Sequence, residues 1–186
     1  MPYNTVNKIV VTWDGWRDRI LKKARSDEYS SKSFFVSEDR EDLIRELEDA
    51  DVAMVAMWDP ELLSACHNLR WVHAVSGGIE GYLFPEFVQT SVPFTCGKPT
   101  FGVPGAESAL AAMLMVTRRN HYAIGHSKTT HWLQSRDDEL FPEDLSGKTV
   151  GIIGMGQMGQ ALAPRAAALG MRVFSATRTP RHASEG

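Results

Sequence analysis

The sequence predicts an α/β protein in which helices cover both faces of a parallel sheet. In the first 80 residues, short apolar runs alternate with amphipathic helical patterns, and parallel strands require crossover helices of this kind. Farther along, residues 149–153 form another apolar run, which leads through a glycine-rich turn into a further helical pattern. These observations predict two α/β units within the 186 residues.

The first unit is predicted to alternate strands and helices from residue 8 onward. Leu43, Ile44 and Leu47 share one helical face, and Pro60 suits the first position of a helix. Ligands of such sheets bind beyond the carboxyl ends of the strands. Strands are expected at 8–13, 33–36, 52–57 and 71–75, and helices at 16–26, 39–49 and 61–67.

The second unit is predicted to follow a loop rich in proline and glycine at 85–104, which includes a short strand. A long helix is expected from Gly105 to about Ile124, with Glu107 near its positive end. Pro164 lies inside a later helical pattern and predicts either a kink or a later helix start. The remaining expected elements are a strand at 149–153, a helix at 160–169 and a strand at 171–176.

The composition argues against nucleic acid and membranes as partners. Twenty lysine and arginine residues against 23 aspartate and glutamate give a net charge of −3, so no cationic surface for nucleic acid is predicted. The longest apolar run, Ala109–Val116, is far shorter than the roughly 18 residues of a membrane span, and no membrane partner is expected. Cys66 and Cys96 are expected to be reduced, inert thiols, which favours the cytoplasm.

A dinucleotide fingerprint follows the strand at 149–153. Gly154 permits a tight turn, Gly156 lets the backbone approach a pyrophosphate, and Gly159 lets the helix pack near the strand. The N–H groups and dipole at the helix N-terminus would hold the phosphates. The motif GxGxxG in this setting is therefore a candidate cofactor site, and a glycine turn without a ligand is the alternative. Its residues are Gly154, Met155, Gly156, Gln157, Met158 and Gly159.

The cofactor preference is predicted from the residues about 20 positions beyond the first glycine. An NAD site usually carries an acidic residue there for the adenosine ribose, and residues 174–178 contain none. Thr177, Arg178 and Arg181 instead offer a hydroxyl and two guanidinium groups that match a 2′-phosphate. The sequence thus favours NADP (NADPH) over NAD. Solvated loop charges are the alternative.

Several segments together resemble the D-isomer-specific 2-hydroxyacid dehydrogenases over nearly the whole chain. They are the first α/β unit, the helix that begins Gly105-Ala106-Glu107, Trp132 and residues 145–156. The resemblance implies a flavodoxin-like doubly wound parallel sheet at 1–100, which binds substrate. It implies at 101–186 a linking helix and the first part of a Rossmann dinucleotide-binding domain, left incomplete.

Within this resemblance, Ser76, Gly77 and Gly78 are similar to the family loop that binds the substrate carboxylate. Two glycines after a strand can also form an anion-binding turn by their own chemistry, and a plain β-turn is the alternative. The implied reaction is hydride transfer between NAD(P)H and a small 2-keto acid. The pair Thr177-Arg178 is similar to the NADPH-preferring glyoxylate and hydroxypyruvate reductases.

The family's catalytic Arg, Glu and His follow the second half of the cofactor domain, a region that this sequence of 186 residues does not reach. The resemblance therefore assigns no catalytic residue here, and the chain alone is expected to be inactive. Family members form two-fold dimers through the cofactor domains and the linking helix. A homodimer is accordingly expected.

A signalling module is the alternative from another class. Asp14, Asp59 and Lys98 follow strands, where a phospho-acceptor receiver domain holds its acidic pocket and lysine, with Asp59 as the acceptor. Trp13 stands where a second acid would help to bind Mg²⁺, which argues against this alternative. No metal site is predicted, because the five-residue spacing of His121, His126 and His131 puts neighbouring histidines on different helical faces.

Overall fold

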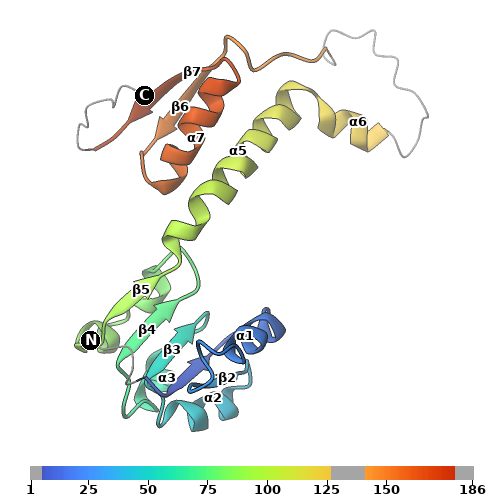
Figure 1. Cartoon of the computed structure of the whole chain (residues 1–186). Coiled ribbons are helices and arrows are strands. Elements are labelled where there is room, and N and C mark those ends of the chain that lie inside the picture. The colour runs from blue at the N-terminus through green and yellow to red at the C-terminus, as the bar shows by residue number, and fades with distance from the viewer. Residues whose placement is uncertain (1–5, 127–140, 179–186) are drawn as a thin grey trace. The chain divides into compact units, whose positions relative to one another are not determined.

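The chain forms two compact units, Met1–Lys98 (unit 1) and Pro99–Gly186 (unit 2), in the computed structural model, which describes residues 6–126 and 141–178. Each unit combines parallel strands with helices (Figure 1).

Unit 1 is built on a five-stranded sheet in which all neighbouring strands are parallel. The strand order is β2-β1-β3-β4-β5, which is the flavodoxin-like order, so the predicted fold class is confirmed. All five carboxyl ends consequently meet at one edge of the sheet. The strands are β1 (Lys8–Val11), β2 (Ser33–Val36), β3 (Val52–Val55), β4 (Trp71–Ala74) and β5 (Phe94–Cys96).

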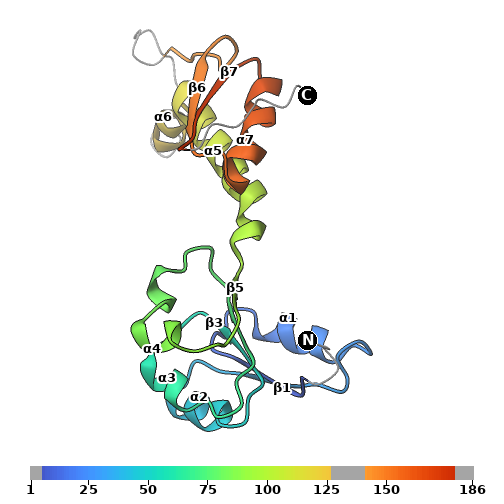
Figure 2. The ribbon, with the colours of Figure 1, turned by 90° about the vertical axis from the view of Figure 1, so that its left-hand side faces the viewer.

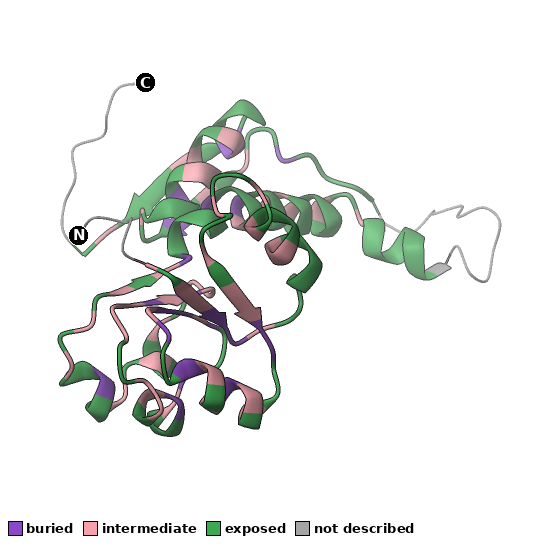
Figure 3. Ribbon diagram, turned by 60° about the horizontal axis from the view of Figure 1, so that its bottom comes forward, coloured by how far each residue is buried: buried purple, intermediate pink, exposed green. Residues whose placement is uncertain are grey.

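Helices α1 (Arg17–Ala24), α2 (Arg40–Leu47), α3 (Pro60–Ser64) and α4 (Pro85–Val88) connect these strands. The chain order reverses between β1 and β3, so right-handed crossovers place α1 on one face of the sheet and the other three helices on the opposite face. That second face holds the main core (Figure 3), whereas α1 buries no residue. The buried core residues are Val10, Leu43, Leu47, Ala50, Ala53, Val55, Trp58, Leu62, Val72, Ala74 and Phe87.

Two aspartates begin the helices on the core face. The Asp39 carboxylate accepts a hydrogen bond from the Asp42 N–H at 3.0 Å at the start of α2. Asp59 accepts from the N–H groups of Glu61 and Leu62 at the start of α3. Such caps satisfy helix N–H groups that have no partner inside the helix, which explains why both helices begin where they do.

Unit 2 contains a two-stranded parallel sheet and three helices among its described residues. Strands β6 (Thr149–Ile153) and β7 (Arg172–Ala176) pair in register, and α7 (Gln157–Ala168) connects them. Helix α5 (Gly102–Thr117) packs against α7, and α6 (Asn120–His126) follows it (Figure 2). This βαβ unit is the predicted beginning of a Rossmann domain. A small core of Leu145, Ala166 and Met171 lies beneath α7.

The helices of unit 2 differ from the predicted ones in three respects. The long helix begins at Gly102, with Pro104 in its first turn, where a missing N–H is tolerated, so Glu107 lies beyond that turn. It ends at Thr117, because Arg119 takes a left-handed conformation with φ of 56°, so the prediction of one helix to Ile124 was wrong. Helix α7 begins at Gln157 and continues through Pro164, so the later start was also wrong.

Helix α5 is unusually apolar on its exposed surface. The segment Lys98–Thr117, which includes the 3₁₀ helix η3 (Lys98–Phe101), is long and apolar enough to cross a membrane by length and composition alone. Core helices of soluble proteins pass the same test, but here only 11% of the segment is buried. Val103, Leu114, Met115 and Val116 are exposed apolar side chains of α5.

Candidate functional site

The glycine-rich turn of unit 2 has the geometry that its sequence requires. Gly154 has φ of 90°, a conformation that L side chains rarely adopt. A Cβ on Gly159 would lie 2.5 Å from the Gly154 carbonyl oxygen, closer than any real contact. Two of the three motif glycines are therefore demanded by the backbone itself.

The N-terminus of α7 presents a row of N–H groups. Gly156 is its N-cap residue and supplies no side-chain acceptor. Within the described residues, no hydrogen bond is donated by the N–H groups of residues 155–158. A Cβ on Gly156 would meet nothing within 4 Å, so the space beside this N-cap residue is open. Open space, free donors and the positive helix end together fit a pyrophosphate.

The end of β7 lies beside this turn. The Gly154 N–H donates to the Ala176 carbonyl oxygen at 2.8 Å, which extends the strand pairing to the first motif glycine. Thr177 and the exposed Arg178 come directly after Ala176, so they leave the sheet at the same edge as the turn. No acidic residue lies at 174–178 to bind a ribose. Arg181 lies outside the described residues.

A second anion-binding geometry follows β4 in unit 1. Ser76, Gly77 and Gly78 form a bend after the strand, anchored by the Gly97 N–H, which donates to the Ser76 carbonyl oxygen at 3.0 Å. Within the described part of the chain, the N–H groups of Gly77 and Gly78 donate no hydrogen bond. Two adjacent free donors at the carboxyl end of a parallel strand suit a carboxylate.

The Ser76 hydroxyl has a different role from the two glycine N–H groups. It lies 2.7 Å from the Gly78 carbonyl oxygen, to which it donates, so it closes the bend upon itself. The Ile79 N–H is also engaged, because it donates to the Glu80 carboxylate at 3.0 Å. The free donors of this loop are thus concentrated at Gly77 and Gly78.

Asp59, the acceptor of the signalling alternative, is committed to structure. Besides capping α3, its two carboxylate oxygens accept hydrogen bonds from the Arg40 guanidinium at 2.9 and 3.0 Å. Arg40 also pairs with Glu61. The Arg40 hydrogen bonds hold the pKa of the Asp59 carboxyl below its usual value. A carboxylate with both oxygens engaged is poorly placed to attack a phosphodonor, so the geometry does not favour a receiver.

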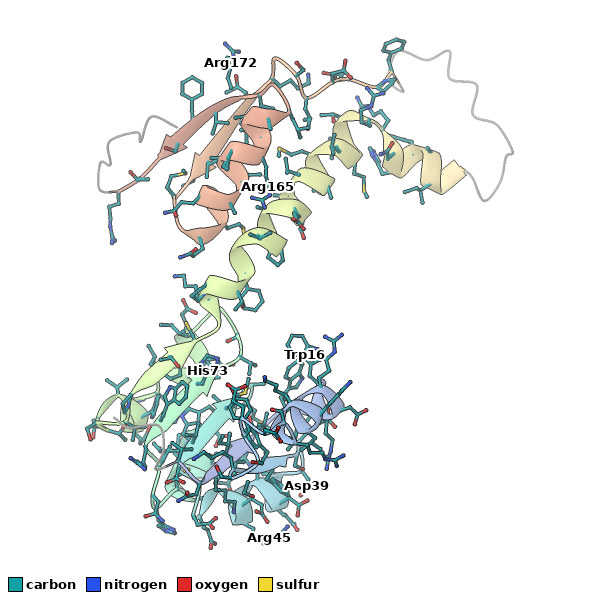
Figure 4. The ribbon with its side chains drawn as sticks, in the orientation of Figure 1. Trp16, Asp39, Arg45, His73, Arg165 and Arg172 are labelled. Carbon is teal, nitrogen blue, oxygen red and sulfur yellow. The ribbon has the colours of Figure 1, made fainter. Side chains whose placement is uncertain are left out.

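Local contacts or burial account for several other polar side chains. His73 (Figure 4) lies on β4, where its Nδ1 is 2.8 Å from the Thr95 hydroxyl, and burial lowers its pKa. Burial raises the pKa of the Cys66 thiol to about 12, which agrees with the expected inert cysteine. His121 faces the Met115 carbonyl oxygen, and His131 lies outside the described residues. The described residues contain no cluster that could hold a metal ion.

Comparison with known proteins identifies relatives across the chain. Residues 110–186 match the family model described as D-isomer specific 2-hydroxyacid dehydrogenase, NAD binding domain. Glyoxylate/hydroxypyruvate reductase B of Yersinia pestis (strain Pestoides F) is 30% identical over 128 residues, which are 68% of this chain and 39% of that protein. The chain therefore spans well under half the length of this curated relative.

Solved structures match nearly the whole chain. The TT0316 protein of Thermus thermophilus is 26% identical with a TM-score of 0.73, and the match covers 94% of this chain and 57% of that one. D-lactate dehydrogenase of Aquifex aeolicus, solved with NAD and lactic acid, has a TM-score of 0.75 at 22% identity, covering 94% of this chain and 52% of that one. At 22% identity, the likeness to D-lactate dehydrogenase is a likeness of fold alone.

The parallel sheet of unit 1 and the glycine-rich βαβ unit of unit 2 define an α/β protein with a dinucleotide-binding domain of the Rossmann type. The comparisons support the D-isomer specific 2-hydroxyacid dehydrogenase family, whose NAD binding domain residues 110–186 match.

Proposed function

We propose that this protein is an oxidoreductase that transfers hydride between NAD(P)H and a small 2-keto acid. The observation that carries the proposal is the uncapped N-terminus of α7, where the N–H groups of residues 155–158 donate no hydrogen bond among the described residues. In this proposal the pyrophosphate lies on those groups, and the bound nicotinamide supplies the hydride. The chain's own part is to bind and orient the cofactor and the substrate.

The substrate carboxylate is proposed to bind the N–H groups of Gly77 and Gly78. Support comes from the absence of other acceptors for these donors within the described residues. Ser76 then contributes as the residue that closes the loop. A substrate of the glyoxylate or hydroxypyruvate type is proposed from the name of the Yersinia pestis relative, which is 30% identical to this chain.

NADPH is the proposed cofactor form. Arg178 is exposed and follows the end of β7. Residues 174–178 contain no carboxylate, which would repel a 2′-phosphate or bind a free ribose. A guanidinium group pairs with two phosphate oxygens at once, which favours the phosphorylated cofactor. Thr177 and Arg181 belong to the same proposed contact.

No residue of this chain is assigned to proton transfer. We propose that the residues of this chain supply binding and orientation of the cofactor and the substrate. A homodimer in the cytoplasm is proposed as well. Its support is the exposed apolar side chains of α5, which include Met115 and Val116, since exposed apolar surface is unfavourable in water unless a partner covers it.

The test of the proposed function is nucleotide binding by the full 186-residue chain. Isothermal titration with ADP-ribose and its 2′-phosphate should show binding that Gly156→Glu abolishes, because the new carboxylate would occupy the open space at the helix end and repel phosphate. Gly125→Glu is the matched control, since a Cβ there also meets nothing within 4 Å, but on α6. Equal binding by both variants would contradict the site.

A further inference from the structure

The hydroxyl group of Tyr82 connects two loops at the carboxyl edge of the unit 1 sheet. Tyr82 ends the 3₁₀ helix η2 (Glu80–Tyr82), shortly after the carboxylate-binding loop proposed above. Its hydroxyl donates to the Ala56 carbonyl oxygen at 3.1 Å, in the segment after β3. The same hydroxyl lies 3.2 Å from the Ser76 hydroxyl, in the loop after β4, and Ser76 shares its single hydrogen between this oxygen and the Gly78 carbonyl oxygen. One oxygen atom thus bridges the ends of adjacent strands.

The Ala56 side of this bridge is fixed independently. Thr12, which is 1% exposed, accepts hydrogen bonds from the N–H groups of Ala56 and Met57 at 3.2 and 3.3 Å. The Thr12 hydroxyl also donates to the Met57 carbonyl oxygen at 3.0 Å. Because Thr12 follows β1 directly, the segment after β3 is held from the neighbouring strand. Tyr82 therefore bonds to an anchored carbonyl group.

The ring of Tyr82 is held by packing. It lies against Phe94 of β5, with ring centroids 6.1 Å apart, and belongs to the border of the main core. Packing of the ring limits the positions that the hydroxyl can take. The Tyr82 hydroxyl is thus fixed by its own ring and by Ala56, and it can orient the Ser76 side chain. Ser76 in turn contacts the Gly78 carbonyl oxygen.

We infer that Tyr82 is a positioning residue for the proposed carboxylate-binding loop. Its hydroxyl orients Ser76, whose hydrogen bond to the Gly78 carbonyl oxygen closes the loop around the two intervening peptide groups. These two peptide groups carry the N–H groups of Gly77 and Gly78, so Tyr82 acts on them through the shape of the loop. Tyr82 itself does not touch the substrate in this arrangement. The inference rests on the proposed function, because it assigns a role toward the carboxylate that this loop is proposed to bind.

The experiment uses the full 186-residue chain labelled with ¹⁵N and oxamate as an unreactive analogue of a 2-keto acid. In the wild-type protein, oxamate should move the amide signals of Gly77 and Gly78. Tyr82→Phe keeps the ring and removes the hydroxyl with its contacts to Ala56 and Ser76, and it should raise the dissociation constant for oxamate about tenfold, in the range of a typical hydrogen-bond contribution. Tyr29→Phe is the matched control, because Tyr29 packs against Phe34 in the same unit and should leave the constant unchanged.

A double-mutant cycle separates positioning from a general loss of stability. Ser76→Ala removes the other partner of the same contact. In the Ser76→Ala background, Tyr82→Phe should therefore change the oxamate affinity little further. A merely structural tyrosine would lower the melting temperature equally in both backgrounds and leave the oxamate affinity of folded protein unchanged. That independence of the two substitutions would overturn the role of Tyr82.

The two proposals fail in distinguishable ways. If oxamate binds wild type and Tyr82→Phe equally at Gly77 and Gly78, the carboxylate site stands and only the positioning role is overturned. If oxamate leaves both amide signals of the wild-type protein unmoved, the carboxylate site is overturned and the role of Tyr82 with it.

Discussion

Gly159 approaches Gly154 so closely that a Cβ on Gly159 would stand 2.5 Å from the Gly154 carbonyl oxygen. That oxygen belongs to the backbone of the turn and cannot rotate away like the end of a side chain. The distance therefore links the packing of α7 to the shape of the glycine-rich turn, and a methyl group at 159 must displace one of them.

Gly159→Ala should destabilise unit 2 by about 1–3 kcal/mol, the usual effect of forcing an extra carbon into a packed site. Hydrogen exchange of the β6 amides measures this, and nucleotide affinity should fall in the same variant. Gly125→Ala is the matched control, because its Cβ meets open space on α6. Slow exchange and unchanged affinity in Gly159→Ala would show that the turn accommodates the methyl group.

Arg178→Ala should remove the preference for the phosphorylated nucleotide. The full chain is expected to bind 2′-phospho-ADP-ribose roughly tenfold more tightly than ADP-ribose at low salt, which corresponds to about 1.4 kcal/mol. Arg172→Ala tests an exposed arginine at the other end of β7 and should keep the difference. Equal affinities of the wild-type chain for the two nucleotides would refute the NADPH assignment.

Acid should weaken unit 1 through Asp59. Its pKa is lower in the folded chain than in the unfolded chain because of the Arg40 hydrogen bonds, so the folded state takes up a proton less readily. The stability from this pair is present above about pH 4, the ordinary value for aspartate, and is lost as the pH falls through the lowered pKa. Because both side chains are partly exposed, the expected contribution is at most about 1 kcal/mol.

Urea unfolding at pH 7 and pH 3, followed by tryptophan fluorescence, measures this acid effect, since four of the five tryptophans lie in unit 1. Asp59→Asn keeps a helix-capping side chain but removes the charge, so it should lose less stability between the two pH values than the wild type. Asp18→Asn, on exposed α1, is the control. An equal loss in Asp59→Asn and wild type would show that the ion pair contributes nothing.

The exposed face of α5 should hold two copies together. Light scattering is expected to give twice the chain mass of 20.7 kDa at micromolar concentration. Val116→Glu places a charge on this face and should yield monomers, because burying an unpaired carboxylate is strongly unfavourable. Val88→Glu alters an equally exposed valine of α4 and should leave the dimer intact. A wild-type monomer would rule out the assembly.

Much of the fold is predictable from the sequence because its signals are local. The run Val52–Val55 is apolar on both faces, as a central parallel strand must be, and Pro60 marks the first turn of α3. Gly154 and Gly159 are likewise identifiable, because their spacing after a strand is typical of a tight turn that leads into a closely packed helix. The all-parallel order of unit 1 follows from the alternation of strands and helices.

The parts that escaped prediction depend on contacts between distant segments or on tolerated exceptions. The break after Thr117 depends on the left-handed Arg119, a conformation without a glycine or asparagine to announce it. Pro164 was expected to kink α7 or to delay its start, and α7 begins well before it, at Gln157. The bridge from Tyr82 to Ala56 spans 26 residues, and a tyrosine in a loop carries no sign of such a partner.

The helix ends of the two units differ in electrostatic character. The positive N-termini of α2 and α3 are neutralised by the chain's own carboxylates, Asp39 and Asp59, whereas α7 begins at a glycine that brings no charge. An anion in solution must compete with a covalently tethered aspartate at the first two helices and meets no such competitor at α7. The built-in caps thus compete with dissolved anions at α2 and α3, whereas the N-terminus of α7 carries no such competitor.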